Sequence, residues 1–272
     1  MLIDKAAIKK LVQEASITAK DRVLEIGGGS GELTEEIAFH TGYVYVVEKD
    51  PAYASELRKR FASIKKIRVM EGDILNVILP EFDKIVSNPP YGIIQPFFLR
   101  LLHERKHEFQ SCTIIVPYGF SSLITAKPGS RGFGTMAAFF YAFYNVETIS
   151  DVDKAAFNPK PKVKSVILKI SPREDDTLLS EILRLMFLGG ERKTRNLIID
   201  ALWNNGNSLF GREMTKRESR MVIMEMQERQ GMKSTLEKRM LQLSNEEMSV
   251  LSSSLLSLLK NLPMLQNPLQ LF

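Results

Sequence analysis

The sequence predicts an α/β fold in which a mostly parallel sheet with an antiparallel edge strand is followed by a small all-helical C-terminal domain. Between residues 22 and 117, short β-branched runs alternate with segments that carry apolar residues at helical spacing. Beyond about residue 172 the strand-like runs stop, and nearly every segment has helical spacing. The 272 residues are enough for one large and one small domain.

The predicted strands of the first part are five β-branched runs: 22–27, 43–50, 66–73, 82–88 and 111–117. They are almost continuously apolar, which is typical of parallel strands covered by helices on both faces. Helices are predicted at 31–40, after Asp50-Pro51, and around 96–103. A further helix is expected after Asp4, ahead of the first strand. The alternation indicates a Rossmann-like sheet.

The pattern changes after about residue 140. The runs "YNVETISDV" (144–152) and "VKSVILKIS" (163–171) predict two late strands, antiparallel at a sheet edge. Pro172 and the acidic "REDD" that follows it mark a boundary. We therefore expect a first domain at 1–172 and a helical domain at 173–272.

The helical domain is expected to have a core in which methionine fills gaps. Seven of the twelve methionines lie between Met214 and Met248, and gap-filling core is their commonest role. The serine- and leucine-rich tail keeps Leu251, Leu255, Leu258 and Leu262 at helical spacing, so an amphipathic helix is predicted there.

Composition excludes several classes of protein. No stretch approaches the ~20 uninterrupted apolar residues of a membrane span. The N-terminus carries acids and has no long apolar core, so we expect that it is not a signal peptide. Cys112 is the single cysteine, which excludes an internal disulfide and a cysteine-rich metal site and fits a reducing cytoplasm. His103 and His107 are four apart, but no third ligand lies nearby. We predict a cytoplasmic monomer without a metal.

The charge distribution favours an anionic partner. The net charge is +5 and the pI about 9.1, and basic runs lie at 58–68, 154–164 and 191–195. The first run holds six basic residues and no acid. Three separate runs are a candidate nucleic-acid footprint. The candidate contacts are Arg58, Lys59, Arg60, Lys65, Lys66, Lys160, Lys162, Arg192, Lys193 and Arg195.

Polar groups and glycines follow three successive predicted strands. "VLEIGGGSGELT" places Gly27 and Gly29 directly after the first strand, where the backbone can approach a ligand closely. Its G-x-G-x-G spacing does not meet the dinucleotide fingerprint, because position 32 is glutamate. Glu48 ends the second strand, where a carboxylate can accept from both hydroxyls of a ribose, and Asp73 ends the third. The sequence therefore predicts a binding crevice at this edge of the sheet.

The segment "IVSNPPY" ends the fourth strand beside that crevice. An exocyclic amine such as adenine N6 is a poor nucleophile, because its lone pair is delocalised into the ring. The Asn88 side-chain oxygen and the Pro89 carbonyl can hold its two N–H groups, so that the lone pair points at a methyl donor. Tyr91 offers a flat face on which the base can stack.

The order "VLEIGGGSGELT", "YVVEKD", "EGDIL", "IVSNPPY" resembles a class I S-adenosylmethionine-dependent methyltransferase. "LITAKPGSRGFGTMA" (123–137), "AFNPKPKVKSVILKISP" (156–172) and "GGERKTRNLI" (189–198) are similar to segments of the small-subunit rRNA adenine dimethyltransferases. The F-x-P-x-P-K-V element is the most specific of these, and the resemblance runs from Leu2 to about residue 260.

The resemblance implies N6,N6-dimethylation of two adjacent adenosines in the 3′-terminal hairpin of small-subunit rRNA, within a pre-ribosomal particle. It implies S-adenosylmethionine as cofactor and a base held between Tyr91 and Phe157, after the base has left its stack. The basic runs then become contacts to RNA phosphates. The cofactor contacts that the matching motifs imply are Leu2, Glu25, Gly27, Gly29, Glu48, Asp73 and Asn88.

Three departures from the family pattern leave alternatives open. The chain starts at Met1-Leu2 where the family has Q-N-F-L, Pro89 replaces a leucine, and "VPYGFSSLI" (116–124) stands where the family has Q-K-E-x-x-x-R. One alternative is methylation of another planar amine or amide, such as a protein glutamine. The other is an assembly factor that binds pre-rRNA without catalysis.

Overall fold

The computed structural model describes residues 1–104, 109–174 and 177–261, and the chain forms two compact units. The first unit comprises residues 1–121 and 146–172. The second comprises residues 122–145 and the described residues from Arg173 onward. Among the described residues, no helix is both long and apolar enough to cross a membrane.

Within the described ranges, a sheet of seven strands is the frame of the first unit. The strands are β1 (Arg22–Ile26), β2 (Tyr43–Glu48), β3 (Ile67–Glu71), β4 (Lys84–Ser87), β5 (Ser111–Pro117), β6 (Tyr144–Val152) and β7 (Ser165–Pro172). Their order is β3-β2-β1-β4-β5-β7-β6, with the first five parallel and β7 antiparallel to β5. This confirms the predicted Rossmann-like sheet with its antiparallel edge.

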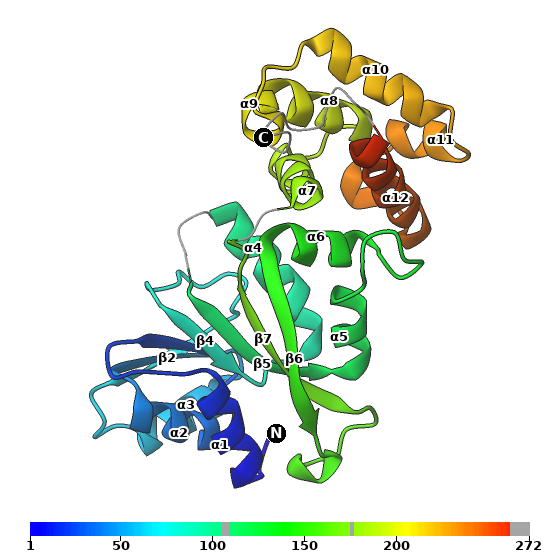
Figure 1. Ribbon diagram of the computed structural model, residues 1–272. Coiled ribbons are helices and arrows are strands. Elements are labelled where there is room, and N and C mark those ends of the chain that lie inside the picture. Colours follow the sequence, from blue (N-terminus) through cyan, green and yellow to red (C-terminus); the bar gives the residue numbers. More distant parts are fainter. Residues whose placement is uncertain (105–108, 175–176, 262–272) are drawn as a thin grey trace, which may run out of the picture. The chain divides into compact units, whose positions relative to one another are not determined.

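Helices cover both faces of this sheet (Figure 1). They are α1 (Lys5–Glu14), α2 (Glu32–His40), α3 (Pro51–Arg60), α4 (Ile94–Glu104) and α5 (Tyr118–Ile124), with short 3₁₀ turns η1 (Tyr91–Ile93) and η2 (Lys154–Ala156). Successive strand residues point to opposite faces, and the neighbours Val23 and Leu24 are both fully buried. Leu11 of α1, Ile37 of α2 and Leu57 of α3 share one core cluster with the strand residues of a single face.

Two aspartates start helices in the way the sequence predicts. Asp4 accepts a hydrogen bond from the Ala7 amide at 2.7 Å and begins α1. Asp50 accepts from the Ala52 amide at 2.8 Å, and Pro51 takes the first helical position of α3, where its missing N–H has no partner to lose. The start of α3 is therefore fixed directly after β2.

The second unit is helical. Its elements are α6 (Thr135–Phe143), α7 (Leu178–Leu188), α8 (Thr194–Asn204), α9 (Gly206–Phe210), α10 (Lys216–Gln227), α11 (Met232–Glu237), η3 (Met240–Gln242) and α12 (Asn245–Asn261). Thr177 and Thr215 form capping boxes at α7 and α10, which satisfy backbone donors at both helix starts. Leu262 of the predicted terminal stripe lies outside the described residues.

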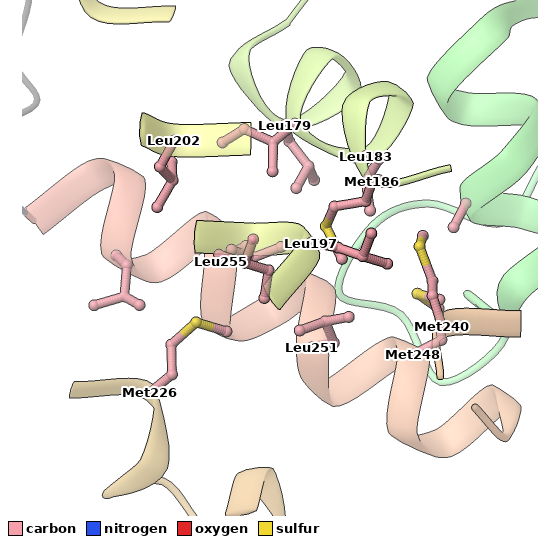
Figure 2. Packing of buried hydrophobic residues seen from close by; sticks show 14 of the residues in the cluster. Leu179, Leu183, Met186, Leu197, Leu202, Met226, Met240, Met248, Leu251 and Leu255 are labelled. Carbon is pink, nitrogen blue, oxygen red and sulfur yellow. The ribbon is translucent and has the colours of Figure 1, made fainter. Parts of the chain in front are cut away.

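Methionine and leucine side chains fill the centre of the second unit. Figure 2 shows Met186, Met226, Met240 and Met248 interleaved with leucines of α7, α8 and α12. Of the seven methionines from Met214 to Met248, five are buried, as gap-filling core predicts. Met221 and Met224 of α10 are exposed.

The compact units divide the chain differently from the expected boundary in one segment. Residues 122–145, which include α6, fall in the second unit instead of the first. Phe133, Ala137 and Ala142 belong to the core cluster that α7, α8 and α12 form. The chain returns to the first unit at Val146 and enters the second unit again at Arg173, directly after Pro172.

Candidate active site

The site lies at the carboxyl edge of the sheet, where the strand order reverses. β1 is paired with β2 on one side and with β4 on the other, and both are parallel to it. Ligands bind at such a reversal in open α/β sheets, because the connections leave in opposite directions there. The Ser87 hydroxyl donates to the Ile26 carbonyl at 2.7 Å, which ties the end of β4 to the end of β1. Gly27 and Asn88, the next residues of each strand, are thereby brought to one place.

A cavity of about 450 Å³ opens at this edge. That volume is within the range of small-molecule pockets, roughly 300–1,000 Å³. Predicted site residues that line it are Gly27, Gly29, Glu48, Asn88, Pro89, Tyr91 and Phe157. Lining residues that sequence reasoning missed are Met1, Asp50, Tyr53, Pro90, Pro159 and Pro161.

The glycine loop and Glu48 form one wall of the cavity. Gly27 and Gly29 have φ of 78° and 52°, the left-handed region that favours glycine, and both residues line the cavity. The Gly29 amide donates to Glu48 Oε2 at 3.0 Å, and the Asp50 amide donates to Oε1 at 2.9 Å. These two bonds fix the carboxylate. Each oxygen keeps a lone pair, so Glu48 can also accept from the hydroxyls of a ribose.

The Asn88–Tyr91 turn forms the opposite wall. Asn88 lines the cavity and is half-buried, and its side chain makes no hydrogen bond with another residue that the structure describes. Pro89 is buried. The Tyr91 hydroxyl lies 3.3 Å from the Ser165 hydroxyl at the start of β7, which holds the phenol ring beside the cavity. The amide of Asn88 is therefore free to bind a substrate, while the ring of Tyr91 is anchored.

The N-terminal segment pairs with the residues around Phe157. Leu2 and Phe157 form an antiparallel bridge, and the Asn158 amide donates to the Met1 carbonyl at 2.8 Å. Both Leu2 and Phe157 are buried, and the Met1 side chain reaches the glycine loop at Gly29. Leu2 is therefore paired with Phe157 through the backbone and is not itself a lining residue.

Glu25 lies behind the glycine loop and does not line the cavity. It is fully buried on β1, where its carboxyl accepts a hydrogen bond from the Thr34 hydroxyl at 2.6 Å. Burial raises the pKa of Glu25 to about 8, and the nearby Glu48 and Glu32 carboxylates act in the same direction. At neutral pH the carboxyl is protonated and links β1 to α2.

Asp73 also lies outside the lining of the cavity. Its carboxylate accepts from Lys49 Nζ at 2.8 Å and from the Leu75 amide at 2.9 Å. The hydrogen bond from Lys49 holds the pKa of Asp73 below its usual value. Asp73 therefore follows β3 at the carboxyl edge of the sheet, where it is paired with Lys49.

The predicted basic contacts fall into two groups. Arg58 pairs with Glu71, Arg60 with Glu35, Arg192 with Asp200, and Lys193 and Arg195 with Glu237, while Lys66 donates to the Thr41 carbonyl. In contrast, Lys59, Lys65, Lys160 and Lys162 are exposed and form no ion pair with any described residue. The second group keeps its full charge for an external anion.

No group of three or more His, Cys, Asp or Glu residues could hold a metal ion within the described ranges. His107 lies outside them. Cys112 is buried on β5, and burial raises the pKa of its thiol far above the usual value. It is therefore an inert packing residue.

Comparisons with known proteins show the family of the chain. The sequence model of the family "Ribosomal RNA adenine dimethylase" matches residues 1–216. A probable ribosomal RNA small subunit methyltransferase A from Methanococcoides burtonii is 35% identical over 204 residues, 73% of this chain and 74% of the relative. The protein of the same name from Thermococcus onnurineus is 31% identical over 254 residues, 91% of this chain and 87% of the relative.

A solved structure shows the same fold. The dimethyladenosine transferase from Plasmodium falciparum superposes with a TM-score of 0.63 at 24% identity, covering 96% of this chain and 98% of that chain. The family match covers the glycine loop, Glu48 and the Asn88–Tyr91 turn. The chain belongs to the ribosomal RNA adenine dimethylase family.

Proposed function

We propose that this chain transfers methyl groups from S-adenosylmethionine to N6 of two adjacent adenosines in the 3′-terminal hairpin of small-subunit rRNA, acting on a pre-ribosomal particle. The observation that carries the proposal is a single cavity with two different walls. One wall is the glycine loop with Glu48, and the other is the unpartnered Asn88 amide with Tyr91. A cofactor and a planar amine can therefore meet in it.

The residues of the first wall fit S-adenosylmethionine. Gly27 and Gly29 adopt the positive φ of a tight loop, and the Glu48 carboxylate, fixed by the Gly29 and Asp50 amides, would accept hydrogen bonds from the hydroxyls of a ribose. The exposed Tyr53 at the start of α3 adds a ring to the same wall. When bound, the cofactor would supply an electrophilic methyl group.

The second wall acts by positioning. The Asn88 side-chain oxygen and the Pro89 carbonyl accept the two N6 hydrogens, which turns the nitrogen lone pair toward the methyl group. Tyr91 and Phe157 hold the base between their rings after it has left its stack. Transfer would be an in-line displacement in which the N6–carbon bond forms as the sulfur–carbon bond breaks and S-adenosylhomocysteine leaves. The amine would release its proton to solvent afterwards, so no general base is needed.

RNA phosphates contact the exposed lysines around the cavity. Lys160 and Lys162 alternate with Pro159 and Pro161, which contribute to the lining of the cavity. Lys59 and Lys65 extend this footprint along the first unit, while the paired cations contribute less. All lining residues belong to the first unit, which supports a catalytic domain that ends at Pro172. The enzyme acts as a monomer in the cytoplasm.

The test is incubation with radiolabelled S-adenosylmethionine and small ribosomal subunits that lack these methyl groups, followed by nucleoside analysis. We expect label in N6,N6-dimethyladenosine of the small-subunit rRNA. Subunits that bind the protein but acquire no label would identify an assembly factor. Label in a protein glutamine would identify a different planar substrate.

A further inference from the structure

A tyrosine ring projects into solvent at the carboxyl end of β5. Tyr118 is 56% exposed, and its side chain makes no hydrogen bond or ring contact with any residue that the structure describes. Its backbone is fixed, because its amide donates to the Lys164 carbonyl at 2.9 Å. An exposed aromatic ring on a rigid backbone is an available contact surface.

Tyr118 is directly connected to the residues that hold the catalytic turn. The preceding residue, Pro117, is the register partner of Ser165, whose hydroxyl lies 3.3 Å from the Tyr91 hydroxyl. β5 pairs with β4 at Ser87↔Ile114 and continues to Pro117. It therefore extends roughly 10 Å beyond the end of β4, at ~3.3 Å per residue. Tyr118 therefore lies at the same carboxyl edge of the sheet as the Asn88–Tyr91 turn.

The surface next to Tyr118 has room and positive charge. A side chain on Gly119, the next residue, would meet nothing within 4 Å. Val163 is half exposed, and the lysines on either side of it, Lys162 and Lys164, form no ion pair with a described residue. A flat aromatic face next to unpaired cations is the combination with which proteins bind single-stranded nucleic acid.

Tyr118 does not line the cavity, so a small cofactor held there does not require it. The ring lies within the segment 116–124, where the chain departs from the family pattern. A base in the pocket must have left its stack, and its neighbour in the strand then loses a stacking partner. An exposed ring beside the pocket can replace that partner.

We propose that Tyr118 is a stacking platform for the nucleobase next to the target adenosine, and that it positions the RNA strand so that the target base enters the Asn88–Tyr91 pocket. The inference rests on the proposed function, because it assumes an RNA substrate. Tyr118 is a positioning residue: it touches the neighbouring nucleotide and not the reacting nitrogen.

The first test compares Tyr118→Ala with Tyr118→Phe in steady-state methylation of unmethylated small subunits. Loss of a base–aromatic stack weakens RNA binding by between about five- and 150-fold. We expect Tyr118→Ala to raise KM for the subunits within that range, and Tyr118→Phe to stay within about twofold of wild type. Affinity for S-adenosylmethionine should be unchanged in both. Phe39→Ala is the matched control, because Phe39 is 75% exposed on α2 and lines no part of the cavity.

The second test does not depend on methyl transfer. A hairpin RNA with two adjacent loop adenosines carries 2-aminopurine on either side of the target in turn, and its fluorescence is read at saturating protein. Stacking on Tyr118 quenches the probe in wild type and in Tyr118→Phe, and Tyr118→Ala restores the emission at one of the two positions. Equal emission in Tyr118→Ala and wild type would overturn the proposal. If wild type quenches the probe but transfers no methyl group, the proposed function fails and the stacking role stands.

Discussion

We predict that Glu25→Gln stabilises the protein at pH 8 and leaves its stability almost unchanged at pH 5. Glu25 is fully buried on β1, with one hydrogen bond from Thr34, and burial raises its pKa to about 8 from an ordinary value of 4.5. Glutamine has the same shape and keeps an oxygen that accepts from Thr34. The substitution therefore removes the ionisable group and leaves the packing and the hydrogen bond from Thr34 in place.

The magnitude follows from the two pKa values. Between pH 4.5 and about 8 the folded carboxyl keeps a proton that the unfolded chain has released. Stability therefore falls as pH rises, by about 1.4 kcal/mol per pH unit. From pH 5 to pH 8 the loss is on the order of 4 kcal/mol. Below pH 4.5 both states are protonated and above about 8 both are ionised, so the dependence ends at either side.

The assay is urea unfolding of wild type and Glu25→Gln at pH 5, 6, 7 and 8. The difference in unfolding free energy between the two proteins should grow with pH across this window. Glu32→Gln is the contrasting variant. Partial burial acts to raise the pKa of Glu32, but hydrogen bonds from Ser30 and Arg60 outweigh it, and the pKa lies below the usual value. The difference in unfolding free energy between Glu32→Gln and wild type should stay constant from pH 5 to 8. If the difference in unfolding free energy between Glu25→Gln and wild type were equal at pH 5 and pH 8, Glu25 would not be protonated in the folded protein across this range.

Two further predictions concern the substrate side. Ser165→Ala removes the hydroxyl that lies 3.3 Å from the Tyr91 hydroxyl, and a hydrogen bond of about 1 kcal/mol corresponds to roughly a fivefold loss of kcat/KM. Tyr91→Phe removes the other hydroxyl of the same hydrogen bond. The double variant should therefore lose no more kcat/KM than either single variant. Additive losses would show that the two hydroxyls do not act through a shared bond. Lys160→Ala and Lys162→Ala should each weaken RNA binding and lower the slope of log affinity against log salt by about 1. Lys193→Ala should change the RNA affinity and the salt slope less, since the Lys193 ammonium is 2.8 Å from Glu237. If Lys193→Ala changed them as much as Lys160→Ala does, the distinction between paired and unpaired cations would be wrong.

Much of the first unit was predictable, because its strands are nearly continuous apolar runs and parallel strands meet at one edge. That rule alone placed Gly27, Glu48 and Asn88 together, and in the structure all three line the same cavity. The late strands 144–152 and 163–171 were also predicted at the antiparallel edge, where β6 and β7 lie.

The features that sequence reasoning missed depend on contacts between distant residues. The basic run at 191–195 is unremarkable as a local pattern, and nothing in it indicates that Glu237 neutralises Lys193 and Arg195. Asp73 ends its strand as expected, but its partner Lys49 follows a different strand. α6 is apolar on all sides, so its sequence does not indicate which of its faces packs against the rest of the protein. Its membership of the second unit could therefore not be predicted. Asp50 and Tyr53 did carry a signal, since the first turn of a helix that follows Glu48 must face the same edge.

The central claim is that Asn88 presents an adenine N6 to a methyl donor. The most direct measurement compares wild type with Asn88→Ala on the same unmethylated small subunits, with the nucleosides separated by mass and the RNA affinity determined in parallel. We predict dimethyladenosine from wild type, a loss of at least about 100-fold in transfer by Asn88→Ala, and RNA affinities within twofold of each other. Transfer by Asn88→Ala at close to the wild-type rate would contradict the account.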